Sequence, residues 1–361
     1  FMSDGFTINS THQDINANND TYIYLAIAAD PDQTDPTVEN SFSPILWSGS
    51  GSARSITGLG FKPDLVWWKA RNASNYNWKA VDSINGPTKN LYNNLTNSLA
   101  TDVSTTSFDD DGFTFGSGGN GNVNGLNYVG YTWKAGDHDD SIPQINTEGT
   151  IDSIVSVNDA AGFSIVKFQT NSSEQTVGHG LSSAPEIIIA KSLSNGSLNW
   201  NVWVSGFSDY QGMSLNTSGA KYTNSSARTV YSTSSTTMGL GLQFLGSNYY
   251  GANTDIIAYC WYSVSGHSKI GSYTGNNTSQ TINVGFQPRF VMIKGNLAST
   301  NWVMVDSLRD NGDEWLYANT SDSTYDDGNT YTSFASNGFS VNTSATYVNA
   351  NGYTYIYMAF K

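Results

Sequence analysis

The chain has 361 residues, of which 38% are hydrophobic, 13% aromatic and only 13% charged. Its 30 acidic and 16 basic side chains give a formal net charge of −14, which excludes nucleic acid as the main partner, because nucleic-acid-binding proteins carry basic surfaces. The single cysteine excludes an intrachain disulfide, and no apolar run approaches the roughly 20 residues that span a bilayer, so we expect no membrane insertion.

The first thirty residues match the closing part of two later segments of the same chain. FMSDGFTI at the start aligns without a gap on residues 108–115 and 334–341, and TYIYLA at residues 21–26 matches residues 354–359. Internal similarity of this kind indicates a repeat protein. We therefore expect residues 1–30 to be the C-terminal part of a truncated repeat, and the chain to continue a longer polypeptide.

A linker and a first complete repeat follow. Residues 31–43 contain two prolines and several acidic residues, which is typical of a linker. The repeat predicted at residues 44–137 opens with a Gly turn, a Pro, a polar residue and four apolar residues that end at Lys69. A short apolar run rich in aromatic and β-branched residues indicates a strand covered on both faces.

The same pattern returns twice, after a second linker predicted at residues 138–150. It predicts a divergent repeat with insertions at residues 151–267 and a third repeat at residues 268–361. The markers are the Lys that closes the first strand and the Trp of the second strand: Lys69, Lys191 and Lys294, and Trp78, Trp200 and Trp302. From one copy to the next, the Lys and the Trp shift by nearly the same number of residues. This agreement indicates that the repeats are genuine.

The fold class follows from the contents of each repeat. Six to eight short strands per repeat, joined by turns rich in Gly, Ser, Thr and Asn, leave no helical pattern between them. We predict an all-β protein made of tandem antiparallel β-sandwich repeats of jelly-roll-like form.

Catalytic and metal-binding patterns are missing from the sequence. The four histidines have no metal-ligand spacing: His12, His138, His179 and His267. We interpret His179 as a turn residue that caps backbone groups and Cys260 as a packed thiol. The acidic clusters at residues 109–111 and 326–327 read as solvated turns, although calcium binding stays open. We predict no enzymatic activity, no metal and no cofactor.

Aromatic residues that break the repeat pattern are candidates for ligand binding. A ring face can stack on the apolar face of a sugar while amides and carboxylates bind its hydroxyl groups. The recurring Trp of the second strand is expected to pack in the core instead. The ligand-binding candidates are Trp68, Trp203, Tyr210 and Trp315. Variation between copies also points to inserted loops, such as residues 205–231, as the place of specificity.

Several segments together resemble a repeat domain of virion proteins from marine tailed bacteriophages, commonly called tail fibre or structural proteins. They are KIGSYTGN at residues 269–276, GFQPRFVMIK at 285–294, VGHGLSSAPEIIIAK at 177–191 and NGYTYIYMAFK at 351–361. The resemblance extends over nearly the whole chain and carries no catalytic motif. It implies a virion component that is assembled in the host cytoplasm with other virion proteins.

These observations predict a non-enzymatic tail fibre or surface appendage that attaches to a host glycan. Several weak sites on one particle would supply avidity. A homo-oligomer, for example a trimer, is expected. The alternatives are a purely architectural capsid or tail decoration, a carbohydrate-active depolymerase, and a cellular adhesin.

Overall fold

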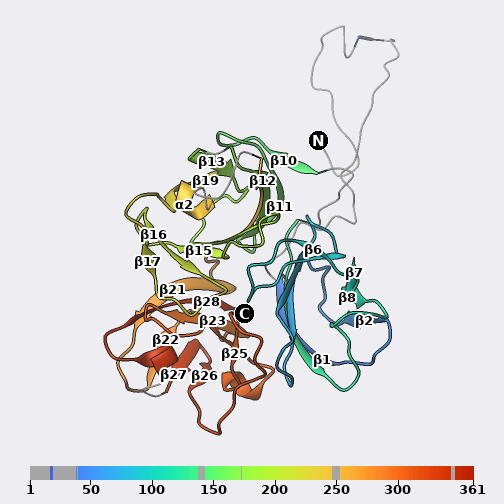
Figure 1. Ribbon diagram of the computed structural model, residues 1–361, viewed down its shortest axis with the longest axis vertical. Helices are drawn as coiled ribbons and strands as arrows, with labels where there is room; N and C mark the ends of the chain where they lie inside the picture. The colour runs from blue at the N-terminus through green and yellow to red at the C-terminus, as the bar shows by residue number, and fades with distance from the viewer. Residues whose placement is uncertain are drawn as a thin grey trace. The chain divides into compact units, whose positions relative to one another are not determined.

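The computed structural model describes residues 17–18, 38, 40–136, 143–171, 173–245, 253–342 and 346–361 (Figure 1). The partial repeat predicted at residues 1–30 lies outside these ranges except for residues 17 and 18. Residues 36–361 form one compact unit. No helix within the described ranges is long and apolar enough to cross a membrane.

The first repeat consists of nine strands. They are β1 Phe42–Ser48, β2 Arg54–Thr57, β3 Leu65–Ala70, β4 Lys79–Asp82, β5 Lys89–Asn90, β6 Ala100–Thr101, β7 Thr105–Asp109, β8 Gly112–Phe115 and β9 Asn127–Trp133. A four-stranded sheet in the order β1-β9-β3-β4 faces a three-stranded sheet in the order β2-β8-β7, and β5 pairs with β6. All the pairings are antiparallel.

The second repeat keeps this plan and adds strands at both edges of its larger sheet. Its elements are β10 Gln144–Asn146, β11 Ser153–Asn158, β12 Phe163–Gln169, β13 Gln175–Gly178, β14 Ile187–Ser192, β15 Asn201–Val204, β16 Gln211–Ser214, β17 Tyr222–Thr223, β18 Val230–Thr233, β19 Thr237–Leu240, α2 Leu242–Leu245 and β20 Asp255–Trp261. The large sheet has the order β10-β11-β12-β20-β14-β15-β16-β17, and the small one β13-β19-β18.

The third repeat returns to the simpler plan. Its elements are β21 Ser268–Thr274, β22 Gln280–Asn283, β23 Phe290–Gly295, β24 Val303–Asp306, η1 Asp310–Gly312, β25 Leu316–Tyr317, β26 Thr332–Ala335, β27 Gly338–Val341, α3 Thr346–Asn349 and β28 Thr354–Phe360. The sheets are β21-β28-β23-β24-β25 and β22-β27-β26. The prediction of an all-β fold of antiparallel sandwich repeats is therefore confirmed.

The structure moves two of the predicted boundaries. Strand β1 begins at Phe42, inside the linker predicted at residues 31–43, because the Phe42 side chain is buried and stacks on Phe360 with ring centroids 4.9 Å apart. Strand β10 lies inside the linker predicted at residues 138–150 and pairs with β11.

The recurring Gly-Phe sequence has a steric reason. A Cβ atom on Gly112 would lie 1.8 Å from the backbone oxygen of Ile56 on the neighbouring strand, and one on Gly338 would lie 2.0 Å from that of Ile282. No other residue type fits such a close approach of two backbones. The following Phe113 is fully buried in the sandwich.

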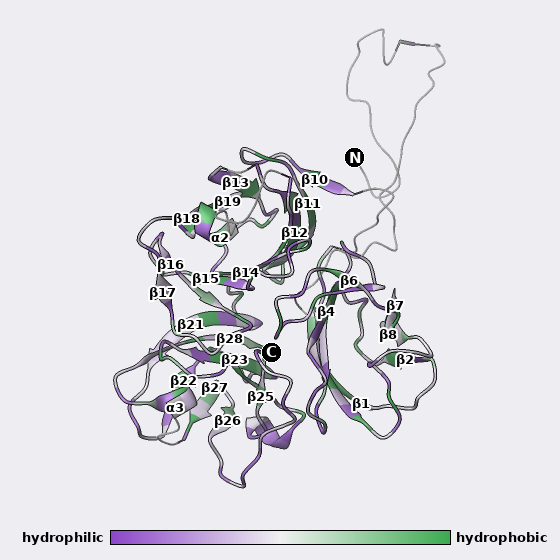
Figure 2. Ribbon diagram, in the orientation of Figure 1, coloured by the Kyte–Doolittle hydropathy of each residue, from purple (hydrophilic) through white to green (hydrophobic). Residues whose placement is uncertain are grey.

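Both faces of each large sheet are buried, as the apolar runs predicted. Alternate residues of the strands that end in Lys enter one core shared by the three repeats: Leu65 and Trp67, Ile187 and Ile189, and Phe290 and Met292. The residues between them enter a separate core in each repeat: Val66 and Trp68, Ile188 and Ala190, and Val291 and Ile293. In Figure 2 hydrophobic segments lie on strands such as β12 and β23.

Three tryptophan bridges join the repeats in a closed cycle. Each indole N–H donates to a backbone oxygen of another repeat: Trp78 to Tyr317 at 2.9 Å, Trp200 to Tyr92 at 2.9 Å, and Trp302 to Ser214 at 3.0 Å. The first repeat thus binds the third, the third binds the second, and the second binds the first. The three sandwiches are therefore parts of one closed assembly within the chain.

Candidate binding surfaces

The tryptophan bridges are held in place by asparagine pairs that recur in every repeat. The Trp78 backbone N–H donates to Asn94 Oδ1 at 3.0 Å, and Asn94 Nδ2 donates to Asn77 Oδ1 at 2.7 Å. The same two bonds are made by Asn216 with Asn199 and by Asn319 with Asn301. The downstream asparagines were missed in the sequence analysis, although each lies 16 or 17 residues after its Trp.

Two of the three junctions between repeats also contain a buried tyrosine–carboxylate pair. The Tyr131 hydroxyl donates to Asp306 Oδ2 at 2.8 Å, and the Tyr259 hydroxyl donates to Asp82 Oδ2 at 2.9 Å. Burial raises the pKa of both tyrosines well above the usual value, so their hydroxyls stay protonated and remain donors.

The third junction lacks this pair. Strand register places Met358 where the other repeats have Tyr131 and Tyr259. Val204 occupies the position of Asp82 and Asp306 at the end of the fourth strand. Both replacements are apolar, and both side chains belong to the shared core. The junction between the second and third repeats is therefore the one that relies on apolar packing alone at this position.

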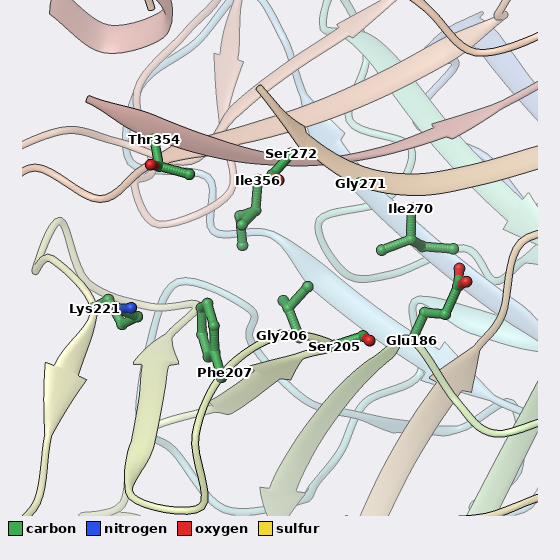
Figure 3. A pocket seen from close by; sticks show the side chains of 11 residues that line it. Glu186, Ser205, Gly206, Phe207, Lys221, Ile270, Gly271, Ser272, Thr354 and Ile356 are labelled. Atoms are coloured by element: carbon green, nitrogen blue, oxygen red, sulfur yellow. The ribbon is translucent and has the colours of Figure 1, made fainter. Parts of the chain in front are cut away.

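A pocket of about 350 Å³ opens at this third junction (Figure 3). It is lined by apolar side chains of both repeats, including Val204, Phe207, Ile270 and Ile356. Lys221 lies beside Phe207, with Nζ 5.1 Å from the ring centroid, while Glu186 lies near Ile270. The Glu186 carboxylate accepts hydrogen bonds from the backbone N–H and the hydroxyl of Ser263.

The short side chain of Ser272 accounts for the pocket at this junction. The residues in the same register of the other repeats, opposite Val129 and Ile257, are Leu46 and Lys167. Their long side chains are partly buried, whereas the short Ser272 leaves the space beside Ile356 unfilled. The pocket is thus a local loss of side-chain volume rather than a cleft between separately folded domains.

A second surface, here called the tyrosine patch, consists of Tyr317, Tyr325, Tyr331 and Tyr347 in the third repeat. Tyr325 and Tyr347 are 40% and 37% exposed. Tyr317 stacks on Tyr347 at a centroid distance of 6.0 Å and lies 6.4 Å from Tyr325. The rings of Tyr325, Tyr331 and Tyr347 lie 5.2 to 6.4 Å from the buried Trp315. The four tyrosines therefore form one continuous aromatic surface over a fixed indole.

Polar groups border the tyrosine patch on one side. Asp327 Oδ2 accepts hydrogen bonds from the hydroxyls of Tyr325 at 2.9 Å and Tyr331 at 2.7 Å. These bonds, that of Tyr331 first, lower the pKa of Asp327, and the bond to the carboxylate raises the pKa of Tyr325 to about 12. Asp327 is thus a carboxylate and Tyr325 a neutral phenol at neutral pH, and the nearby Asn329 is exposed.

The loop that carries the tyrosine patch is anchored to the first repeat. The backbone N–H of Thr324 donates to Arg71 O at 2.7 Å, and Arg71 forms an ion pair of 3.8 Å with Glu314. The Trp315 indole N–H donates to Thr332 Oγ1 at 2.8 Å. These contacts fix both ends of the loop, so the aromatic surface is already formed without a ligand.

Three of the four predicted ligand-binding residues are buried and are corrected to core residues. Trp68, Trp203 and Trp315 are 1%, 6% and 1% exposed, so no ring face is free to stack on a sugar. Each of these tryptophans occupies a position where the other copies have a different residue. Such a difference can come from core packing or from a surface site, and the sequence alone does not distinguish the two. Tyr210 is 39% exposed, in the inserted loop at residues 205–231. It is not part of the tyrosine patch.

The predictions for His179 and Cys260 have structural outcomes, whereas His12 and His138 lie outside the described residues. His179 is a backbone-capping turn residue, as predicted: its Nδ1 accepts from the Leu181 N–H at 3.1 Å, which leaves the proton on Nε2, 3.1 Å from Ser234 O. Cys260 is a packed thiol, as predicted, and burial raises its pKa. Asp111 serves a turn, where its carboxylate accepts from the backbone N–H groups of Gly58 and Gly60.

Metal ligands do not gather in the part of the chain that the structure describes. No group of three or more His, Cys, Asp or Glu side chains is placed there to hold a metal ion. The tyrosine patch was missed in the sequence analysis, which singled out only the underlying Trp315. A usable signal was the density of aromatic, Asp and Asn residues between positions 315 and 331.

Comparison with known proteins places the chain in a sequence family. No curated protein matches it. Residues 38–361 match the family described as a domain of unknown function, DUF7483, and the match includes all three complete repeats. The protein is therefore a member of the DUF7483 family.

Proposed function

We propose that the protein is a non-enzymatic structural component of a bacteriophage particle, a tail fibre or surface appendage that attaches to a glycan of the host surface. It would be assembled in the host cytoplasm together with other virion proteins. A homo-oligomer, for example a trimer, stays a prediction within this proposal. The resemblance of the repeats to those of marine phage virion proteins is its starting point.

The observation that carries the proposal is the closed cycle of tryptophan bridges around one shared core. Each repeat is bound to both of the others by a hydrogen bond that involves a buried tryptophan. Such closure opposes the separation of the repeats, as suits a structural component of a particle. The junction between the first and third repeats contains the buried ion pair of Asp306 and Arg309, whereas Glu186 and Lys221, which line the 350 Å³ pocket, are only partly buried.

Locating the chain in intact particles and measuring its effect on adsorption test the proposal. Gold-labelled antibodies against the chain should decorate an appendage of purified particles in electron micrographs. The purified full chain, added in excess, should slow adsorption of those particles to host cells. Label on the capsid without any effect on adsorption would favour the architectural alternative. Absence of the chain from particles would overturn the proposal.

A further inference from the structure

We infer that the tyrosine patch of the third repeat is a binding site for neutral glycans, that is, for chains of uncharged pyranose units. The inference deepens the proposed function and rests on it for the source of the glycan. Its chemical basis is independent, because it follows from the rings and polar groups of the patch itself.

The aromatic surface suits the apolar face of a sugar ring. Tyr325 and Tyr347 each leave more than a third of their surface in solvent, and Tyr317 joins them into one surface. Exposed aromatic residues that merely complete a core are scattered singly, whereas these are contiguous. Rings held in advance lose little conformational entropy when a ligand binds. Two or more pyranose units could therefore stack along the patch.

The polar border supplies acceptors and donors for hydroxyl groups. Asp327 is fully exposed, and its carboxylate keeps acceptor capacity beyond the two tyrosine hydroxyls that it binds. Asn329 adds an amide, whose Nδ2 lies 3.4 Å from the Tyr331 hydroxyl. A sugar whose ring lies on Tyr325 would present its equatorial hydroxyls to this border.

Charge decides which glycans fit. Exposed Asp322 and Asp326 flank Asp327 along the same loop, and the whole chain carries a net charge of −14. Arg71 contacts this loop and is paired with Glu314, and Lys69, whose charge acts on Asp322, is buried. A carboxylated or sulfated sugar would be repelled. An uncharged glycan is the occupant that this electrostatic environment favours.

The equivalent positions of the other repeats argue against a structural role shared by the fold. Strand register places Asn90 and Gly212 where the third repeat has Trp315. Those repeats complete their sandwiches without an aromatic residue there. The patch and its supporting indole are therefore an addition to the common repeat, as expected for a site.

Binding measurements on the full chain with defined oligosaccharides test the site. The probes are maltohexaose, cellohexaose and laminarihexaose, with oligogalacturonate as the anionic control, and affinity is measured by titration calorimetry. At least one neutral probe should bind, and oligogalacturonate should not. Tyr325→Ala and Tyr347→Ala should each weaken binding by about tenfold, because each removes a stacking ring. Tyr353→Ala, at a 42% exposed tyrosine outside the patch, is the matched control and should bind normally.

The outcomes separate the site from the proposed function. Failure of all three neutral probes, or binding unaffected by Tyr325→Ala and Tyr347→Ala in variants with unchanged melting temperature, would overturn the site. If Tyr325→Ala and Tyr347→Ala leave oligosaccharide binding unchanged and both variants still slow particle adsorption as wild type does, the attachment function stands and the site falls. If the neutral probe binds the patch but the chain is absent from particles, the site stands and the proposed function falls.

Discussion

The buried network of Tyr131, Asp306 and Arg309 joins the first and third repeats. Arg309 Nε donates to Asp306 Oδ2 at 2.7 Å, and its Nη2 lies 3.2 Å from the Tyr131 oxygen. All three side chains are shielded from water. A carboxylate and a guanidinium in such a place stabilise the fold as a pair. Removing Asp306 leaves the buried Arg309 with the longer 3.9 Å ion pair to Glu314, and removing Arg309 leaves a buried carboxylate without its cation.

Removing the carboxylate should therefore cost more than removing the hydroxyl. We expect Asp306→Ala to lower the free energy of unfolding by about 3–5 kcal/mol, and Tyr131→Phe by about 1–3 kcal/mol. Urea denaturation followed by tryptophan fluorescence measures both, with the exposed Tyr210→Phe as control. Equal losses for the two variants would contradict a charged network.

At the scale of single residues, the sequence predicted structural roles better than binding roles. The turn role of His179 and the packing of Cys260 followed from their neighbours in the chain. Trp68 and Trp203 were misplaced, because the composition of a local segment does not tell which sheet will cover a side chain. Tyr325 and Tyr347 come together only through tertiary packing around Trp315.

The strands that end in Lys bury an amine in each repeat. Lys69, Lys191 and Lys294 are at most 1% exposed, and their ammonium groups donate to backbone oxygens near the strand end. Loss of hydration lowers the pKa of each to about 8. The free energy of unfolding therefore depends on pH through these three lysines.

We expect stability to rise with pH between about 8 and 9.5 through these lysines. The unfolded chain, with lysine pKa values near 10.4, binds more protons than the folded one in this window, so raising the pH favours folding. Lys191→Met should remove roughly 1–2 kcal/mol of the gain. Urea denaturation of both proteins at pH 7.5 and 9.5 measures the difference. If the free energy of unfolding changes equally with pH in wild type and Lys191→Met, Lys191 stays charged in the folded protein.

Strand β21 offers a second test, because Ser272 leaves the pocket beside Ile356. Ser272→Leu restores the residue that the first repeat has in this register and should stabilise the fold by about 1 kcal/mol, since it buries apolar area. Thermal unfolding measures the gain. Thr274→Leu, two residues along the same strand and outside the pocket, should give none. A loss of stability in Ser272→Leu would mean that the pocket cannot accept the side chain.

On the scale of the whole molecule, the shared core makes the three repeats dependent on one another. Isolating a repeat would expose one face of its large sheet, including residues such as Trp67, Ile189 and Met292. We expect calorimetry of the full chain to give a single unfolding transition for the repeats. Trp200→Phe should lower its midpoint without splitting it, because the variant loses one hydrogen bond but keeps the core. Two or three resolved transitions would contradict this dependence.

The whole-molecule arrangement was the least predictable level. Repeats, strands and burial on both faces followed from periodicity and spacing. The apolar sequences of β3, β14 and β23 predict that both faces of the sheet are buried. They do not show whether the second face packs against a neighbouring repeat or against another chain. No local sequence pattern predicts a core whose side chains lie hundreds of residues apart in the chain. For the tryptophan bridges, the only pattern in the sequence is the recurring Asn-Trp.

The junction between the second and third repeats has a consequence for how such chains diverge. A buried carboxylate without its tyrosine, or the tyrosine without the carboxylate, would leave an unpaired polar group in the core, so neither change is tolerated alone at low cost. Met358 and Val204 replace both members at once. The three junctions of one polypeptide thus contain both solutions, the complete polar pair and its complete apolar replacement, and neither of the half-exchanged forms.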